Sequence, residues 1–429
     1  MERCKRMKAS GISWIQDIPE HWGIRAIFQL ADQVKNKNKE LNEKNLLSLS
    51  YGKIKRKDIN DNEGLLPESF DNYNIIENGD VVLRLTDLQN DHTSLRVGLS
   101  KEHGIITSAY ITLRPTAIVY PNYLYYVLHA YDLVKGFYGM GAGVRQGLNY
   151  DEVKTIKLPF PPLEEQIQIA SYIEDQVSRI DSIIEDAKNT IDDYKKWKTS
   201  VISEAVTKGI KGNASLRDSG IEWIGYVPEH WRLYSLTKAI DSIVDYRGKT
   251  PEKVSSGVFL VTAKNIKDGR IDYSISKEYV RADQYDDIMH RGSLEIGDVL
   301  FTTEAPLGQV ANVDRTDFAL AQRIIKFRAK KELLDNYFLK YWILSFGFQE
   351  NLITHATGST AKGIKASKLG LLKIMVPPIE EQVQIVNYLD SKCESIETIV
   401  NEKQALIEDL ELYKRSVIFE TVTGKRKVV

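Results

Sequence analysis

The chain has 429 residues, with 58 Lys and Arg against 59 Asp and Glu, and a formal net charge of −1. This length predicts two or three domains, each with its own core, and no apolar run reaches the ~20 residues of a membrane helix. The basic N-terminus lacks the apolar stretch of a secretory signal, and Cys4 and Cys393 have no metal-ligand spacing, so we expect a cytoplasmic protein without membrane contact.

A motif near the start of the chain returns in its second half. The stretch GISWIQDIPEHW at Gly11–Trp22, here called box A, matches GIEWIGYVPEHW at Gly220–Trp231 in 8 of 12 positions. Such repetition predicts two similar modules in one chain, related by an approximate two-fold axis.

The variable segment after each box A predicts a mixed α+β module. Apolar alternation indicates strands at Gly79–Leu85 and Ser108–Pro115, and at the corresponding Gly297–Thr303 and Gln322–Ala329. An aromatic-rich amphipathic helix follows in each copy. The two modules thus share a pattern while they differ in most other residues.

A second repeated motif begins a long predicted helix. Box B, PPLEEQIQIASYI at Pro161–Ile173, returns as PPIEEQVQIVNYL at Pro377–Leu389. The prolines and glutamates suit a helix start, and no Gly or Pro interrupts the next 45 residues or so. Apolar residues then recur at alternating spacings of four and three: Ile173, Val177, Ile180, Ile184, Ala187, Ile191, Tyr194 and Val201, and in the copy Leu389, Ile396, Val400, Ile407, Leu410 and Val417.

These two heptad seams predict an antiparallel coiled coil, because two long helices most simply bury their seams on each other. The alternative is that each helix covers its own module. By segment, net charge is +2 for residues 1–157, −4 for 158–208, +4 for 209–373 and −3 for 374–429. The variable segments are therefore the better candidates for contact with an anionic partner, and the acidic helices for contact with protein.

Signatures of catalysis are missing from the sequence. GSTAKGIK at Gly358–Lys365 has Ile364 where a phosphate-binding loop needs Lys, and DEVK at Asp151–Lys154 has no accompanying metal ligands. His21 and His230 lie in the box A copies and are interpreted as buried, hydrogen-bonded structural residues. We expect a non-catalytic chain with no cofactor or metal of its own.

Basic and amide side chains in Gly-containing loops are the candidate contacts to DNA, because Lys and Arg neutralise phosphates while Arg, Asn and Gln can read base edges. The alternative for each cluster is a solvated surface run, and for the Gly-rich loops before box B a plain connector. The candidates are Lys35, Lys37, Lys39, Lys53, Lys55, Arg56, Lys57, Arg145 and Gln146 in the first module, and Arg247, Lys249, Lys264, Asn265, Ser359, Thr360 and Lys362 in the second.

The order of box A, variable segment, Gly-rich loop and box B, present twice, resembles the specificity subunit of type I restriction-modification systems. The resemblance covers nearly the whole chain. It implies target-recognition domain 1 at residues 1–157, a central conserved helical region at 158–212, target-recognition domain 2 at 213–373 and a C-terminal conserved helical region at 374–429. The motif residues that carry over as scaffold are Trp14, Pro19, Trp22, Glu165, Gln166, Trp223, Pro228, Trp231, Glu381 and Gln382.

The resemblance also implies a function. Each domain would read one half of a bipartite, asymmetric site in double-stranded DNA. Two methyltransferase subunits would dock on the conserved regions, and restriction and translocase subunits would join through them, with S-adenosylmethionine and ATP bound by those partners. The alternatives are a coiled-coil scaffold that links two protein-binding modules, a stand-alone sequence-specific DNA-binding protein, and an enzyme with a degenerate site.

Overall fold

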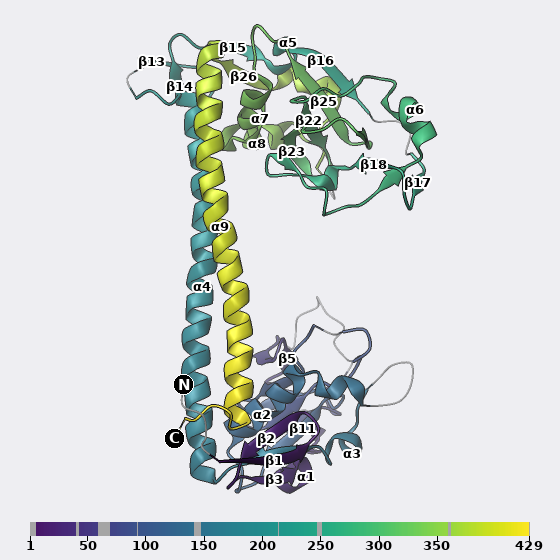
Figure 1. Cartoon of the computed structure of the whole chain (residues 1–429), viewed down its shortest axis with the longest axis vertical. Coiled ribbons are helices and arrows are strands. Elements are labelled where there is room, and N and C mark those ends of the chain that lie inside the picture. The colour runs from purple at the N-terminus through teal and green to yellow at the C-terminus, as the bar shows by residue number, and fades with distance from the viewer. Residues whose placement is uncertain are drawn as a thin grey trace. The chain divides into compact units, whose positions relative to one another are not determined.

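The computed structural model describes residues 6–39, 43–58, 69–91, 93–140, 147–212, 214–246, 251–358 and 362–428. Its contacts divide the chain into two compact units (Figure 1). Unit 1 contains Met1–Ala187 and Ala405–Val429, and unit 2 contains Lys188–Gln404. Each unit therefore holds one α+β module and a part of each of two long helices.

The two long helices are α4 (Leu163–Lys208) and α9 (Ile379–Val422). Both begin after a Pro-Pro pair with two glutamates in the first turn, which favours the positive end of the helix. A glycine with positive φ follows the end of each helix within two residues, +76° at Gly209 and +69° at Gly424, a conformation that a side chain at this position would strain. At 1.5 Å per residue, the 46 residues of α4 span about 70 Å.

The predicted seam is the least exposed stripe of each helix. Most of its aliphatic positions are buried, from Ile173 and Ile180 on α4 to Ile396 and Val417 on α9. The lysines that interrupt the seam find carboxylates on the other helix: Lys414 Nζ lies 2.8 Å from Asp181 in unit 1, and Lys198 Nζ lies 2.5 Å from Glu397 in unit 2.

The main sheet has the same strand order in both units. In unit 1 the antiparallel order is β4 (Ala31–Gln33), β11 (Ile111–Pro115), β8 (Val81–Leu83), β9 (Val97–Leu99). In unit 2 it is β16 (Ile240–Asp245), β25 (Ile324–Ala329), β22 (Val299–Thr303), β23 (Leu307–Asn312). The strands predicted from alternation are β8, β11, β22 and β25, so these predictions are confirmed with slightly shorter bounds.

One face of each main sheet packs against helices. In unit 1, Val81 and Leu83 share a core with α2 (Pro121–Leu133) and with Ile173 and Ile418 of the long helices. In unit 2, Val299 and Phe301 share a core with α7 (Asn336–Leu344) and with Ile202 and Leu389. Each module is thus fixed to the long helices through a common apolar core.

The opposite face of each main sheet covers a second layer of strands. Side chains alternate along a strand, so Val82 and Leu300 point away from the helices into separate cores. In unit 1 this layer is built by β5 (Leu47–Ser50), β6 (Lys53–Arg56), β7 (Asn74–Ile76) and β10 (Gly104–Ile106). In unit 2 it is the sheet of β17 (Lys253–Val254), β21 (Tyr279–Val280), β18 (Val258–Val261) and β24 (Phe318–Leu320).

Short elements complete each unit, and several of them again correspond. The paired strands β1 with β2, and β12 with β3, have counterparts in β13 with β14, and β26 with β15. The bounds in unit 1 are β1 (Met7–Ile12), β2 (Ile15–Pro19), β3 (Gly23–Ala26), α1 (Ile27–Leu30), α3 (Tyr150–Val153) and β12 (Lys157–Phe160). In unit 2 they are β13 (Leu216–Asp218), β14 (Tyr226–Pro228), β15 (Arg232–Ser235), α5 (Leu236–Ala239), β19 (Ile266–Lys267), β20 (Arg270–Ile271), α6 (Tyr285–Met289), α8 (Phe346–His355) and β26 (Lys373–Val376).

In each unit, a histidine of box A contacts a glutamate of box B. His21 Nε2 lies 2.7 Å from Glu165 and His230 Nε2 lies 2.7 Å from Glu381. The interpretation of these histidines as hydrogen-bonded is confirmed, but their predicted burial is wrong: their side chains are 56% and 50% exposed. The imidazoles reach their carboxylates at the surface, because the motif tryptophans rather than the histidines occupy the interior.

A buried glutamine in the first turn of each long helix ties the helix to its module. Gln382 accepts a bond from the Asp335 amide at 2.8 Å and donates to the carbonyls of Leu333 and Pro377 at 2.9 and 2.8 Å. Gln166 repeats this arrangement with the Tyr120 amide and the Pro161 carbonyl, at 2.8 and 2.9 Å. Both side chains are fully buried, so no water can replace these bonds.

We predict that Gln382→Leu lowers the free energy of unfolding of unit 2 by about 3 kcal/mol or more, because one amide and two carbonyls lose their buried partner. Urea denaturation of the full chain measures this change. Gln384→Leu, on the exposed side of the same helix, is the matched control and should change stability by less than about 0.5 kcal/mol. Equal effects of the two substitutions would contradict the assigned role.

His129 makes the stability of unit 1 depend on pH. The ring is buried on α2 and stacks on Tyr125 at a centroid distance of 5.6 Å. Burial, and then the nearby cations Lys414 and Arg415, lower its pKa from 6.5 to about 4. The unfolded chain therefore takes up this proton first, so the stabilisation is complete above pH 6.5 and is lost as the pH falls towards 4.

We predict that His129→Gln weakens the acid sensitivity of the chain. Between pH 7 and pH 5 the wild type should lose about 2 kcal/mol more unfolding free energy than the variant does. Denaturation curves at the two pH values give this difference. Parallel pH profiles would show that His129 titrates normally in the folded chain.

Candidate nucleic-acid interface

The second strand layer of unit 1 carries both of its basic clusters. In the β5–β6 hairpin Leu49 pairs with Ile54, and these side chains join the core. Side chains alternate along the strand, so Lys53 and Lys55 point to the opposite, open side, and both are exposed. Lys57 continues this series and is also exposed.

A continuous ladder joins this hairpin to the other cluster. Leu46 bridges Ile105 on β10, β10 pairs with β7, and Asn74 on β7 bridges Lys37. Lys35 and Lys39 flank that last bridge and are exposed. The structure thus brings the clusters at 35–39 and 53–57 to the two edges of one layer, although some fifteen residues separate them in the sequence.

Lys37 and Arg56 are engaged within the fold. Lys37 Nζ donates to the Asn72 carbonyl at 2.9 Å, and its side chain is half-buried. Arg56 Nε lies 2.5 Å from Glu102, and the hydrogen bond from Arg56 lowers the pKa of that carboxyl. Lys53, Lys55 and Lys57 therefore remain the better candidates for phosphate contacts in this layer.

Tyr51 was not identified from the sequence. It occupies the turn between β5 and β6 with a φ of +48°, and its side chain is 75% exposed. An exposed aromatic ring in a tight turn, next to Lys53, is suited to contact sugar or base faces. The signal was available in SYGK at residues 50–53, a polar turn between two alternating strands.

The second layer of unit 2 surrounds a basic hollow of about 250 Å³. Its lining includes Lys253, Lys264, Gln322 and Arg323, and also Glu278, which lies 2.7 Å from Lys253 Nζ. Arg323 has a φ of +80°, an uncommon conformation for a residue with a side chain, and such strain is frequent at functional sites. Its guanidinium is 2.8 Å from Glu304. Neither Gln322 nor Arg323 was among the sequence candidates.

Lys362 lies close to this hollow. The adjacent Gly363 bridges Glu304, the residue that also binds Arg323. In unit 1 the loop before box B returns at the equivalent place, where the Leu148 amide bonds to the Leu85 carbonyl at 2.9 Å. The loop of unit 1 therefore ends beside the end of β8, and the loop of unit 2 ends beside β22, where the Ile364 amide bonds to the Thr303 carbonyl at 3.0 Å.

Asn265 does not fit the predicted contact with DNA. Its side chain is fully buried, its Oδ1 accepts from the Thr262 amide at 2.9 Å and hydroxyl at 2.8 Å, and its Nδ2 donates to the carbonyls of Asp272 and Ser276, each at 2.9 Å. All of its hydrogen-bonding capacity holds the loop together. Lys264 beside it is exposed. The remaining candidates, Arg145, Gln146, Arg247, Lys249, Ser359 and Thr360, lie outside the described residues.

No group of three or more His, Cys, Asp or Glu side chains in the described ranges is placed to hold a metal ion. Cys393 is buried in α9, and burial raises the pKa of its thiol, which makes it an inert core residue rather than a nucleophile. Within the same ranges, no helix combines the length and apolar character that a membrane crossing requires.

Known proteins share this sequence pattern along the whole chain. The family described as type I restriction modification DNA specificity domain matches residues 19–193 and 257–409. The type I restriction enzyme MjaVIII specificity subunit of Methanocaldococcus jannaschii is 26% identical over 423 residues, which covers 96% of this chain and 94% of that protein. The EcoKI specificity subunit of Escherichia coli K12 is 20% identical over 281 residues, 62% of this chain and 58% of that protein.

Solved structures share the fold. A chain from a study of complex assembly and conformational transition of the type I R-M system superposes with a TM-score of 0.70 at 16% identity, covering 95% of this chain and 99% of that one. The HsdS subunit from Thermoanaerobacter tengcongensis has a TM-score of 0.51 at 16% identity, with 95% and 98% covered. With the family match on both halves of the sequence, the chain belongs to the specificity subunits of type I restriction-modification systems.

Proposed function

We propose that this chain reads a bipartite, asymmetric DNA site, one half with each module. The observation that carries the proposal is the duplication: the main sheet has one strand order in both units, while the second layers and their loops differ. One scaffold that presents two unlike sets of exposed side chains is suited to two unlike half-sites. The domain bounds 1–157, 158–212, 213–373 and 374–429 are part of this proposal.

The second strand layer of each module is the proposed DNA-facing element. In the first module it offers Lys53, Lys55, Lys57 and Tyr51, and in the second Lys264 and Lys362 beside Arg323. Lysines supply phosphate contacts that fix the register on the duplex, and Arg323 with Gln322 can read base edges through paired hydrogen bonds.

Helices α4 and α9 form, in this proposal, an antiparallel coiled coil that sets the distance between half-sites. Support comes from the contacts between the two helices, in which residue numbers rise along α4 while they fall along α9. In unit 2, Lys198 contacts Glu397 while the later Ala205 lies beside the earlier Tyr388. In unit 1, Tyr172 bonds Arg426 while the later Asp181 bonds the earlier Lys414. Half-sites about one turn of DNA apart, ~34 Å, would face both modules with the same groove.

The chain itself is the non-catalytic member of its complex, as specificity subunits are. Two methyltransferase subunits would dock on the acidic helical regions, whose net charges of −4 and −3 disfavour contact with DNA. Restriction and translocase subunits would join through them, and S-adenosylmethionine and ATP would be bound by these partners. The cytoplasmic location stays a prediction.

We predict that Lys55→Glu with Lys57→Glu, or Lys264→Glu with Lys362→Glu, weakens specific DNA binding of the complex assembled with its methyltransferase subunits by about tenfold or more. Each pair should lower the salt slope, log Kd against log salt concentration, by about 2, because two phosphate contacts are lost. Filter binding across a salt series gives both quantities.

Lys157→Glu with Lys331→Glu is the matched control, since both lysines are exposed outside the proposed face. Its salt slope should be unchanged. A sequence-independent scaffold would show no preferred site at all, and the same slope in all variants would reject the second layers as the DNA-facing elements.

We predict that inserting one heptad in α4 between residues 176 and 200, together with a heptad at the facing level of α9, lengthens the recognised spacer by about three base pairs. Seven residues add about 10 Å to a helix and preserve the seam register. Mapping methylated sites of the assembled variant measures the spacer. The half-site sequences should be retained, and an unchanged spacer would contradict the proposed ruler.

A further inference from the structure

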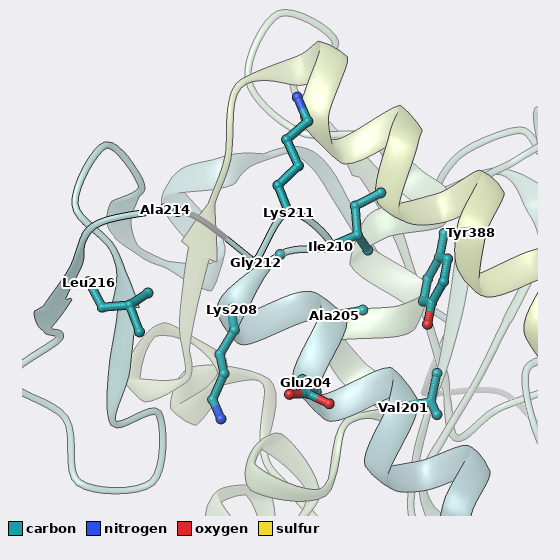
Figure 2. A pocket seen from close by; sticks show the side chains of 11 residues that line it. Val201, Glu204, Ala205, Lys208, Ile210, Lys211, Gly212, Ala214, Leu216 and Tyr388 are labelled. Atoms are coloured by element: carbon teal, nitrogen blue, oxygen red, sulfur yellow. The ribbon is translucent and has the colours of Figure 1, made fainter.

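A hollow of about 470 Å³ lies at the end of α4 in unit 2 (Figure 2). We call it the α4-end pocket. Helix α4 contributes Val201, Glu204, Ala205 and Lys208, helix α9 contributes Tyr388, and residues 209–212, Ala214 and Leu216 complete the wall. The carboxyl group of Glu204 and the ring of Tyr388 come from the two helices on either side of it.

The internal repeat shows what such a pocket holds. In the ungapped alignment of the helices, Val201, Glu204 and Tyr388 correspond to Val417, Glu420 and Tyr172 of unit 1. There the site is filled by Arg426. Its Nη2 lies 3.0 Å from Glu420 Oε2, and its Nη1 lies 3.3 Å from the Tyr172 hydroxyl.

An aromatic ring completes the guanidinium site of unit 1. The guanidinium carbon of Arg426 lies 5.7 Å from the centroid of the Tyr413 ring, and the whole residue is buried with 8% exposure. A carboxylate, a phenol oxygen and an aromatic face together satisfy both the charge and the planar shape of a guanidinium.

Unit 2 keeps the carboxylate and the phenol at its pocket but lacks the arginine. In the alignment Trp197 corresponds to Tyr413, one helical turn before the lining residue Val201, and it is 48% exposed. The position of Arg426 corresponds to Ile210, which is 37% exposed, or to Lys211 if the glycines after the helices are aligned. Lys211 points away from Glu204 and Tyr388 (Figure 2). Among the described residues, none pairs with the Glu204 carboxylate, and even Lys208, one turn along α4, forms no ion pair with it.

The rim of the pocket is partly apolar and could pack against the aliphatic part of a long side chain. Ile210 and Leu216 leave apolar surface exposed there, and the latter is 46% exposed. Lys208 and Lys211 also line the pocket, and in the sequence of unit 1 Lys425 and Lys427 flank Arg426. The pocket is also larger than a guanidinium, so it has room for the aliphatic part of an arginine.

We propose that the α4-end pocket receives an arginine side chain of a methyltransferase subunit, which takes the place that Arg426 occupies in unit 1. This inference rests on the proposed function, in which protein partners dock on the helical regions. Because unit 1 fills its own site, only unit 2 offers the contact. Two copies of one partner would then meet unequal surfaces on a chain that otherwise repeats itself.

A titration of the full chain with acetyl-arginine amide tests the chemistry. Trp197, labelled as 5-fluorotryptophan and identified by the signal lost in Trp197→Phe, should show a saturable shift, and the neutral acetyl-citrulline amide should not shift it. Glu204→Gln should weaken binding about tenfold or more, since a charge-assisted hydrogen bond is lost. Glu420→Gln, the matched change in the filled site, should leave the affinity unchanged.

Equal binding of the arginine and citrulline compounds, or full binding by Glu204→Gln, would overturn the proposal. Saturable binding seen only after Lys211→Ala would also overturn it, because the pocket would then be occupied by the chain's own lysine.

The partner is tested in the assembled complex. A benzoylphenylalanine at position 216 should cross-link to an arginine-containing peptide of the methyltransferase subunit, and cross-links only to arginine-free peptides or to a second copy of this chain would reject the partner.

Methylated sites are mapped with the same preparation, which separates a failure of the pocket from a failure of the proposed function. A bipartite site without the arginine cross-link rejects the pocket alone, whereas the absence of any bipartite site rejects the proposed function.

Discussion

The structure depends on the buried glutamine at the start of each long helix. Gln166 and Gln382 join the first helical turn to the backbone of the module beside it, through bonds that no water can replace. Because an unsatisfied buried amide is costly, each module is held to its helix in one orientation. The apolar cores that include the sheet, α2 or α7, and the seam residues then extend this attachment. The proposed reading of two half-sites at a fixed spacing would require such a connection.

Duplication of one scaffold is consistent with the proposed pair of unlike half-sites. Arg114 with Asp80, and Arg328 with Asp298, form the same ion pair across equivalent strands, at 2.8 and 2.7 Å. In the part of the chain that the structure describes, the second layers differ: one is a ladder that ends at Lys37, and the other is a sheet beside a hollow lined by Lys264 and Arg323. Arg426 shows that the copies have also diverged at the helix ends, where one site is closed and the other open.

Local patterns predicted the elements that rest on periodicity. The seam, the helix starts at the Pro-Pro pairs and the strands β8, β11, β22 and β25 follow from spacing and side-chain alternation. Burial that depends on tertiary contacts was not predictable in this way. His21 lies at the surface beside a carboxylate that is 144 residues away in the sequence, and Asn265 is buried because Thr262 and Ser276 close a loop around it. The joint position of the two lysine clusters and the backbone strain at Arg323 likewise arise from pairing between distant strands.

The most direct test exchanges one module and maps the methylated sites of the assembled complex. Residues 25–157 are replaced by the corresponding segment of another specificity subunit, and the chain is combined with its methyltransferase subunits. We expect a bipartite site in which one half changes, while the other half and the spacer are retained. A change in both halves, or methylation that follows no bipartite site, would contradict this expectation.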